Sequence, residues 1–275
     1  MRSLAWLAVA TLLATSASAA GPEPKAPDWR RVDPENALVI ETNRGRIIVE
    51  MSPEAAPRHV TQIKVLARRK VYDGLTFFRV IDWFMDQTGD PKNTGDGVSS
   101  LPNLKAEFTF RRSEGTSFVP VAAPMGAEEG LVGSLPVVSQ TSALIKLTPD
   151  HQVSAWGTYC PGVAGMARDD DPDSANSQFF LMRHAYPSLD KRYTVWGRVL
   201  VGLDVVRAIT PGEPPPEPDR MLTVRVLADL PEAQRPKVYV IDAKGPAFGR
   251  LLTRTRRARG ADFSICDIEL PVIVR

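Results

Sequence analysis

The chain has 275 residues, of which 43% are hydrophobic and 24% are charged, and its formal net charge is +2. This composition is typical of a globular protein, and the length allows one large domain or a medium domain with additions. The near-neutral charge and the lack of a stripe of aromatic and basic residues argue against a nucleic-acid partner.

The first twenty residues are typical of a secretory signal peptide. Arg2 precedes an apolar run over residues 4–14, and Ala17-Ser18-Ala19 supplies a small-x-small cleavage pattern. The run is too short to span a bilayer comfortably, and no later apolar run is longer, so we expect no membrane span after cleavage. The pattern predicts a periplasmic or secreted mature protein, and an uncleaved anchor is the alternative interpretation.

Residues 21–37 predict a polar N-terminal tether, and two strands and a helix are expected after it. Residues 37–51 are typical of two strands around the turn Asn43-Arg44-Gly45. Residues 53–70 predict an amphipathic helix, because apolar side chains recur there at intervals of four, three and three. These apolar positions are Ala56, Val60, Ile63 and Leu66.

The stretch over residues 71–91 combines an apolar strand with a charge. Arg79 lies inside the apolar run 77–81, and Phe84, Met85 and Gln87 follow it closely. A lone arginine in a strand is most often an edge residue, or one that extends its charged end to water. The arginine alone therefore defines no site. A glycine-rich turn is expected next, followed by a strand over residues 103–110.

The pattern changes between about residues 112 and 159. Glycine and proline occur throughout, the apolar runs are short, and no period is sustained. We interpret this segment as a long insertion that carries some short strands. Regular structure is expected to resume as strands at 162–168, 177–183 and 193–200, a helix at 202–210, a proline-rich spacer at 211–218 and a strand at 221–231.

Residues 231–275 predict a small strand–helix–strand extension. Arginines cluster over residues 250–259, and a solvated face is favoured there over a site for anionic lipid or polymer. Cys160 and Cys266 are the two cysteines, and exported thiols often pair. Sequence does not show whether their Cα atoms lie within bridging range. A disulfide from the end of the insertion to the extension and two separately buried thiols both remain open.

Three runs in chain order resemble the signatures of the cyclophilins. Residues 72–91 contain a phenylalanine-rich strand with its arginine and then Phe-Met-x-Gln, and residues 165–182 contain Ser-Gln-Phe-Phe. Residues 189–209 are similar to the closing segment of the same family. The likeness covers residues 38–230, and Met-Ala-Arg at 166–168 is similar to bacterial exported members.

The resemblance implies a mainly β fold. Residues 38–230 are expected to form a cyclophilin-like closed eight-stranded antiparallel barrel capped by two helices, with residues 231–275 as a small C-terminal appendage. The implied activity is peptidyl-prolyl cis-trans isomerisation of X–Pro bonds, without a cofactor or metal. The implied partners are proline-containing polypeptides, and a monomer is expected. The alternative is a periplasmic proline-peptide binding module or chaperone with little turnover.

The resemblance also implies roles for individual residues. Arg79 corresponds to the catalytic arginine, whose donors face the proline nitrogen. The implied substrate-binding residues are apolar side chains of the proline pocket, polar side chains that hold the substrate backbone, and a segment that pairs with it. They are, respectively, Phe84, Met85, Phe180 and Leu189; Gln87 and Gln178; and Ala167 and Arg168. Phe179 is expected to point into the core, because neighbours in a strand alternate.

Several positions depart from the usual residues of that family. Phe78 stands where histidine is common, Asp82 and Trp83 replace Pro-Gly, Ser188 stands where many members carry tryptophan, and Tyr193 where many carry histidine. These changes put tight cyclosporin binding and the usual substrate preference in doubt. The insertion lies between two strands that supply the site, so we also expect it to border the groove.

Overall fold

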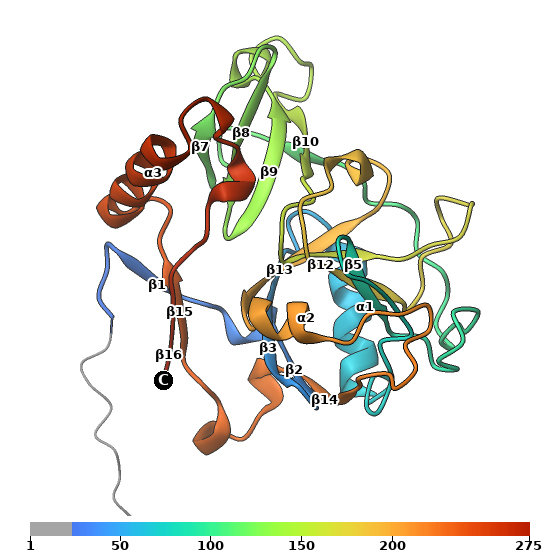
Figure 1. Cartoon of the computed structure of the whole chain (residues 1–275). Helices are drawn as coiled ribbons and strands as arrows, with labels where there is room; N and C mark the ends of the chain where they lie inside the picture. Colours follow the sequence, from blue (N-terminus) through green and yellow to red (C-terminus); the bar gives the residue numbers. More distant parts are fainter. Residues whose placement is uncertain (1–23) are drawn as a thin grey trace, which may run out of the picture.

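Antiparallel β-sheet dominates the fold (Figure 1). The computed structural model describes residues 24–275, so the predicted signal peptide over residues 1–20 lies outside the described residues. The largest sheet has eight strands in the order β14-β2-β3-β13-β11-β12-β5-β4. These strands are β2 (Ala37–Thr42), β3 (Gly45–Met51), β4 (Arg79–Ile81), β5 (Met85–Thr88), β11 (Val163–Met166), β12 (Phe179–Met182), β13 (Val195–Val201) and β14 (Met221–Val226). The mainly β class and the eight-stranded antiparallel sheet are confirmed, whereas full closure and a two-helix cap stay predictions.

Two helices accompany this sheet, α1 (Pro57–Arg68) and α2 (Leu203–Ala208). The predicted apolar face of α1 is buried, and it includes Val60, Ile63 and Leu66. The helix begins at Pro57, a residue well suited to a first helical turn because its missing N–H would have no intrahelical partner there. Within residues 24–275, no helix has the length and apolar character needed to cross a membrane.

The strand predicted over residues 103–110 is wrong for most of its length. Only its last residue belongs to a strand, β6 (Phe110–Arg112), and Leu104 forms an isolated bridge. The Glu107 carboxylate instead accepts hydrogen bonds from the backbone N–H groups of Arg58 and His59, both at 3.2 Å. N–H groups in the first turn of a helix have no intrahelical partner, and a carboxylate that accepts from them stabilises the start of α1. The segment therefore caps a helix in place of pairing in a ladder.

The large sheet separates two hydrophobic clusters. Phe179 and Leu181 pack in one cluster with side chains of α1 and α2. Phe180 and Met182 pack in the other cluster, together with the cores of the insertion and the C-terminal extension. Alternation along β12 produces this separation, because successive side chains of a strand point to opposite faces. Phe179 thus lies in the core opposite Phe180, as the sequence predicted.

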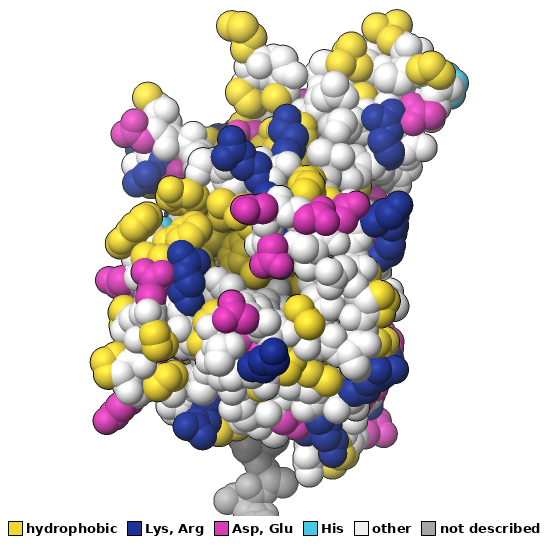
Figure 2. Space-filling view, turned by 90° about the vertical axis from the view of Figure 1, so that its right-hand side faces the viewer, with side chains coloured by type: hydrophobic (Ala, Val, Ile, Leu, Met, Phe, Trp, Pro, Cys, Tyr) yellow, Lys and Arg dark blue, Asp and Glu magenta, His cyan; other side chains and the backbone are white. Residues whose placement is uncertain are grey.

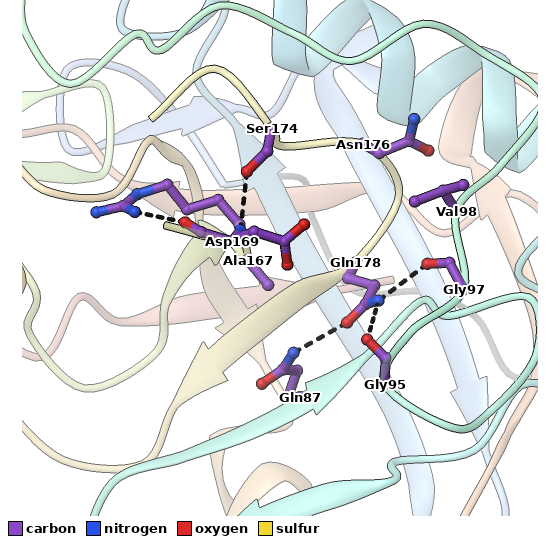
Figure 3. Close-up of a pocket in the computed structure, with 10 residues that line it drawn as sticks. Gln87, Gly95, Gly97, Val98, Ala167, Asp169, Ser174, Asn176 and Gln178 are labelled. Carbon is purple, nitrogen blue, oxygen red and sulfur yellow. Dashed lines mark hydrogen bonds between the residues drawn. The ribbon is translucent and has the colours of Figure 1, made fainter. Parts of the chain in front are cut away.

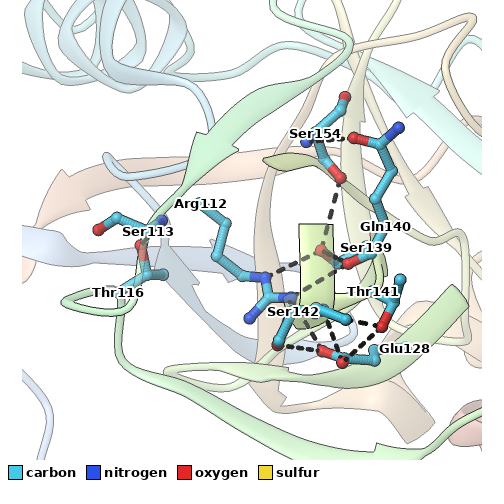
Figure 4. Close-up of polar contacts among 10 residues, drawn as sticks. Arg112, Ser113, Thr116, Glu128, Ser139, Gln140, Thr141, Ser142 and Ser154 are labelled. Carbon is cyan, nitrogen blue, oxygen red and sulfur yellow. Dashed lines mark hydrogen bonds and ion pairs between the residues drawn. The ribbon is translucent and has the colours of Figure 1, made fainter. Parts of the chain in front are cut away.

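The insertion forms an antiparallel sheet of its own, in the order β6-β10-β9-β8-β7. Beyond β6 it contains β7 (Phe118–Ala122), β8 (Ala127–Val132), β9 (Leu135–Gln140) and β10 (Val153–Gly157). Figure 4 shows Arg112 at the centre of its polar contacts: Nε donates to Ser139 Oγ at 2.8 Å, and Nη2 pairs with Glu128 at 2.9 Å. Arg112 is only 4% exposed. A buried charge network replaces part of an apolar interior here, so the sequence shows no sustained hydrophobic period.

The C-terminal extension has the predicted strand–helix–strand order, β15 (Val238–Ile241), α3 (Pro246–Arg259) and β16 (Val272–Val274). The prediction of a plain tether over residues 21–37 differs from the structure, because β1 (Trp29–Arg31) pairs with β15 in a three-stranded sheet. Arg30 also forms a two-pronged ion pair with Glu50 of β3, at 2.6 and 2.7 Å. A three-residue strand held by backbone pairing gives too short a pattern to be recognised in the sequence.

Two contacts join the insertion and the extension to the large sheet. Arg198 of β13 is buried, and its guanidinium donates to Ser134 O at 3.0 Å and to Ile268 O at 2.7 Å. Its burial lowers its pKa to about 10, so it remains charged at neutral pH. A disulfide connects Cys160 to Cys266 across a sequence separation of 106 residues. The end of the insertion is therefore tied to the extension.

We expect the double variant Cys160→Ser/Cys266→Ser to lose about 2–4 kcal/mol of unfolding free energy, because the bond restricts a long loop of the unfolded chain. Urea unfolding of the variant and the wild type measures this loss. A thiol assay of the unfolded wild type without reductant is the control. Two titratable thiols in that assay would contradict the bond.

Asp219 connects segments that are distant in sequence at the start of β14. Its side chain, 2% exposed, accepts hydrogen bonds from Arg44 Nε at 2.7 Å, from Asn43 Nδ2 at 2.5 Å and from the Thr210 N–H at 2.8 Å. Burial alone would raise the pKa of this carboxyl, but the hydrogen bonds from Arg44, Thr210 and Asn43 lower it to about 2. The ionised form is therefore stabilised by the fold.

A lowered pKa means that Asp219 stabilises the protein above pH 4 and that this contribution is lost as the pH falls toward 2. We expect Asp219→Asn to reduce the unfolding free energy at pH 6 by roughly 2 kcal/mol, the equivalent of its pKa shift. The deficit should shrink toward pH 2. Denaturant unfolding across this range tests it, with the exposed Asp96→Asn as control. A deficit independent of pH would refute the ionic origin.

Candidate active site

Three neighbouring strands bring the central residues of the site into one row. Arg79 of β4 lies opposite Gln87 of β5, and Gln87 lies opposite Phe180 of β12. Residues opposite each other in a ladder point to the same face of a sheet. The register therefore aligns an arginine, an amide and an aromatic ring on the face that carries the insertion and the extension.

These residues border a cavity of about 130 Å³. Its lining includes every predicted site residue except Gln178: Arg79, Phe84, Met85, Gln87, Ala167, Arg168, Phe180 and Leu189, together with Tyr193. The volume is well below the ~300–1,000 Å³ typical of pockets for drug-sized ligands. The cavity thus has the size for one side chain. On the face seen in Figure 2, hydrophobic side chains gather in one area bordered by charged ones.

Aromatic packing holds the apolar floor of the cavity in place. The ring of Phe180, 5% exposed, stacks on Tyr159 with centroids 5.7 Å apart and meets the edge of Tyr193 at 5.9 Å. Gly165 leaves the necessary room, because a Cβ atom there would lie 2.6 Å from Phe180 Cζ and 2.6 Å from the Tyr159 hydroxyl. Tyr159 is the last residue of the predicted insertion. The insertion therefore supports the floor from behind and contributes none of the residues that line the cavity.

A chain of amide hydrogen bonds ends at the arginine. Gln178 Nε2 donates to the carbonyls of Gly95 and Gly97 at 2.8 and 2.9 Å, which leaves its oxygen facing Gln87 (Figure 3). Gln87 Nε2 donates to Gln178 Oε1 at 3.0 Å, and Arg79 Nη1 donates to Gln87 Oε1 at 3.4 Å. Each amide is thereby oriented by the next. Gln178 lies outside the apolar cavity, in an adjoining polar pocket that shares Gln87 with it.

The glycine-rich turn at the start of this chain is itself held in place. The Asp90 carboxylate accepts hydrogen bonds from the backbone N–H groups of Lys92, Thr94 and Gly95, at 2.7, 2.9 and 2.5 Å. Burial opposes the charge, but the backbone donors outweigh it and lower the pKa of Asp90. The ring of Phe78 packs near Gly95, where a Cβ atom would lie 3.5 Å from it. The Gly95 and Gly97 carbonyls are therefore presented to Gln178 in a defined position.

Glu213 also belongs to this site, although no sequence pattern pointed to it. Its carboxylate accepts a hydrogen bond from Arg79 Nε at 2.7 Å, and the two side chains are 53% and 40% exposed. Glu213 belongs to the predicted proline-rich spacer, whose Gly212 exchanges two backbone hydrogen bonds with Val80, at 2.8 and 2.9 Å. No local pattern connects residues 134 positions apart, so only the folded chain reveals this pair.

Comparison with known proteins identifies the family. Residues 37–226 match the family described as cyclophilin type peptidyl-prolyl cis-trans isomerase/CLD. A probable peptidyl-prolyl cis-trans isomerase of Brucella suis is 32% identical over 213 residues, which are 72% of this chain and 85% of that protein. The chain belongs to the cyclophilins.

The similarity to a solved cyclophilin extends beyond the matched range. The crystal structure of the cyclophilin AquaCyp293 from Hirschia baltica is 36% identical, with a TM-score of 0.84, and the match covers 90% of this chain and 93% of that one. A peptidyl-prolyl cis-trans isomerase-like protein of Aspergillus fumigatus is 29% identical over 62% of this chain and 79% of its own length. The chain is thus a cyclophilin-type isomerase, and its Arg79, Gln87 and Phe180 lie side by side as the sequence resemblance implied.

Removing the charge of Glu213 should reduce the rate more than substrate binding. We expect Glu213→Gln to lower kcat roughly twofold to fivefold with little change in KM, because an exposed ion pair contributes only ~0.2–1 kcal/mol. The pair orients the Arg79 guanidinium through Nε and leaves the cavity unchanged. Steady-state isomerisation kinetics measure both constants. Glu217→Gln in the same spacer is the control, and equal effects of the two variants would contradict a specific role.

Proposed function

We propose that this cyclophilin accelerates cis/trans isomerisation of X–Pro bonds in exported proteins, with Arg79 as an electrostatic catalyst. The observation that carries the proposal is the position of one guanidinium at the edge of a cavity whose other walls include Phe84, Met85 and Phe180. The cavity accepts the proline ring, and the arginine faces the bond that rotates. This arrangement provides binding and charge stabilisation together.

The chemistry requires neither a nucleophile nor a general base. Resonance gives the peptide C–N bond a rotation barrier of ~18–20 kcal/mol. In the twisted transition state this resonance is lost, and the proline nitrogen becomes pyramidal and basic. A donor aimed at that nitrogen stabilises the transition state more than the planar ground state, which is the condition for catalysis. Arg79 meets it because a guanidinium stays charged and keeps its donors in a rigid plane.

The rest of the site binds the substrate and orients the arginine. Phe84, Met85, Phe180 and Leu189 enclose the proline ring, and an apolar wall also favours the less dipolar twisted amide. Gln87 and Gln178 hold the substrate backbone, and Gln87 orients Arg79 through its amide oxygen. The Ala167 N–H already donates to Gln178 O at 3.0 Å, so we assign its carbonyl and Arg168 to the substrate main chain.

The proposal includes an extracytoplasmic location and a monomeric enzyme whose clients are proline-containing exported polypeptides. Two features support the location. The N-terminal sequence is typical of a cleaved signal peptide. A disulfide connects Cys160 and Cys266, and such bonds persist in oxidising compartments and are rare in the cytosol.

We also propose that the eight-stranded sheet closes into a barrel with α1 and α2 as caps. Backbone hydrogen bonds between the segment before β4 and the start of β14 support closure. They run from the Gly74 N–H to Met221 O at 2.7 Å, from the Met221 N–H to Leu75 O at 2.8 Å, and from the Phe77 N–H to Asp219 O at 2.8 Å. Side chains of both helices pack in one cluster with the sheet, which supports their role as caps.

The decisive experiment compares wild type with Arg79→Ala in a proline-limited refolding assay. We expect kcat/KM to fall roughly a hundredfold, the size of effect known for removal of one donor to a developing charge. Arg79→Lys should recover little of the loss, because an ammonium lacks the planar donor fork. Affinity for an unfolded client should change far less than the rate.

The same assay separates the enzyme from a holding module. Full activity in Arg79→Ala would refute the assigned role of the arginine. A wild type that binds unfolded client but leaves its refolding rate unchanged would instead support the binding-module alternative.

A further inference from the structure

A large aromatic side chain stands exposed beside the proline cavity. Trp83 lies in the turn between β4 and β5 and is 65% exposed. Tryptophan is strongly buried on average in folded proteins, and exposed apolar surface next to a cavity often marks a contact surface. Because Trp83 is mostly exposed, core packing does not explain why a tryptophan occupies this position.

Trp83 forms a continuous surface with two other rings. It stacks on Phe84 with centroids 6.0 Å apart and an interplanar angle of 26°. Tyr186 is 37% exposed, and the centroid of its ring lies 4.7 Å from that of Phe84 and 6.4 Å from that of Trp83. We call these three residues the aromatic shelf. Because Phe84 also lines the proline cavity, the shelf continues directly from the wall of that cavity.

The shelf is held in place by hydrogen bonds. Arg183, 3% exposed, donates through Nη2 to Asp82 at 2.7 Å and through its backbone N–H to Phe84 O at 3.0 Å. These two bonds tie both sides of the Trp83 turn to the end of β12. The Tyr186 N–H donates to Tyr159 O at 2.7 Å. These bonds fix the backbone that carries the rings, which reduces the ordering cost of a contact.

The two ends of the site differ in chemistry. Gln87 and Gln178 form the polar end, where Gln87 Nε2 donates one N–H to Gln178 and has a second N–H that can donate to a peptide carbonyl. The aromatic shelf forms the other end and offers ring faces and edges, and the exposed Asp82 carboxylate beside it is paired with Arg183. A polypeptide that crosses the cavity therefore meets a polar surface on one side of its proline and an aromatic surface on the other.

We propose that the aromatic shelf is a binding subsite for an aromatic or large aliphatic side chain that flanks the client's proline on the side away from Gln87 and Gln178. The inference rests on the proposed function, since it takes the proline to occupy the cavity. An extended chain advances ~3.3–3.6 Å per residue, so a side chain one or two positions from the proline reaches Trp83. Aromatic rings gain from offset or edge contacts beyond simple burial.

The test uses two series of short proline peptides, with Phe or Ala placed before the proline in one series and after it in the other. Exchange NMR gives kcat/KM for each peptide. We expect the wild type to favour Phe over Ala roughly fivefold to tenfold in one series only, as two added ring contacts allow. In Trp83→Ser/Tyr186→Ser this preference should fall below about twofold, and the change should appear in KM.

Control variants separate the shelf from folding defects. Trp83→Phe keeps a ring and should keep most of the preference. Met125→Ser removes a fully exposed apolar side chain of the insertion and should leave the preference unchanged. Near-ultraviolet circular dichroism checks that each variant is folded.

The outcomes are distinct from those that test the catalytic arginine. Binding of the same peptides to Arg79→Ala should show the Phe preference in Kd, even though turnover is lost. A wild type without isomerase activity that keeps this preference would refute the proposed mechanism and support the subsite. Equal preference in wild type and Trp83→Ser/Tyr186→Ser would overturn the subsite. A loss of dimerisation in that variant with unchanged preference would also overturn it, and would identify the shelf as a self-association surface.

Discussion

The pairing register of β4, β5 and β12 governs the geometry of the whole site. Arg79, Gln87 and Phe180 are opposite one another across these strands and share one face of the sheet. A slip by one residue would turn the corresponding side chains toward the core and bring Val80 or Phe179 outward. The hydrophobic cluster on the far face, built with α1 and α2, opposes such a slip because it would lose its buried rings. Core packing thus positions Arg79, the residue to which we assign catalysis.

The additional sheets of this chain share the hydrophobic cluster that contains the floor of the proline cavity. Met85 and Phe180 pack in the same cluster as the interior of the insertion and the extension. Tyr159 stacks behind Phe180, and its neighbour Cys160 is bonded to Cys266 in the extension. A shift of the insertion would therefore move Tyr159 and, through it, the ring of Phe180 at the cavity floor. This connection gives the insertion a structural role in the site although it lines none of the cavity.

Sequence reasoning succeeded where a local pattern or a family motif carried the information. The amphipathic face of α1 followed from its apolar spacing, and the predicted lining of the cavity followed from three runs that resemble the family. It failed at residues 103–110, where Glu107 caps α1, and at residues 29–31, where β1 adds to the extension's sheet. It also missed Glu213 beside Arg79. Each failure involves a polar or backbone contact between distant segments, which leaves no period in the sequence.

The sequence by itself determined the family and the residue types that line the cavity, because these depend on side-chain identity at short, recognisable spacings. Only the tertiary structure decided which charges meet Arg79, how the insertion supports Phe180 and where the rings of Trp83 and Tyr186 come together. The physical reason is that such contacts depend on strand register and loop path. Those arise from packing of the whole chain, and no local segment encodes them.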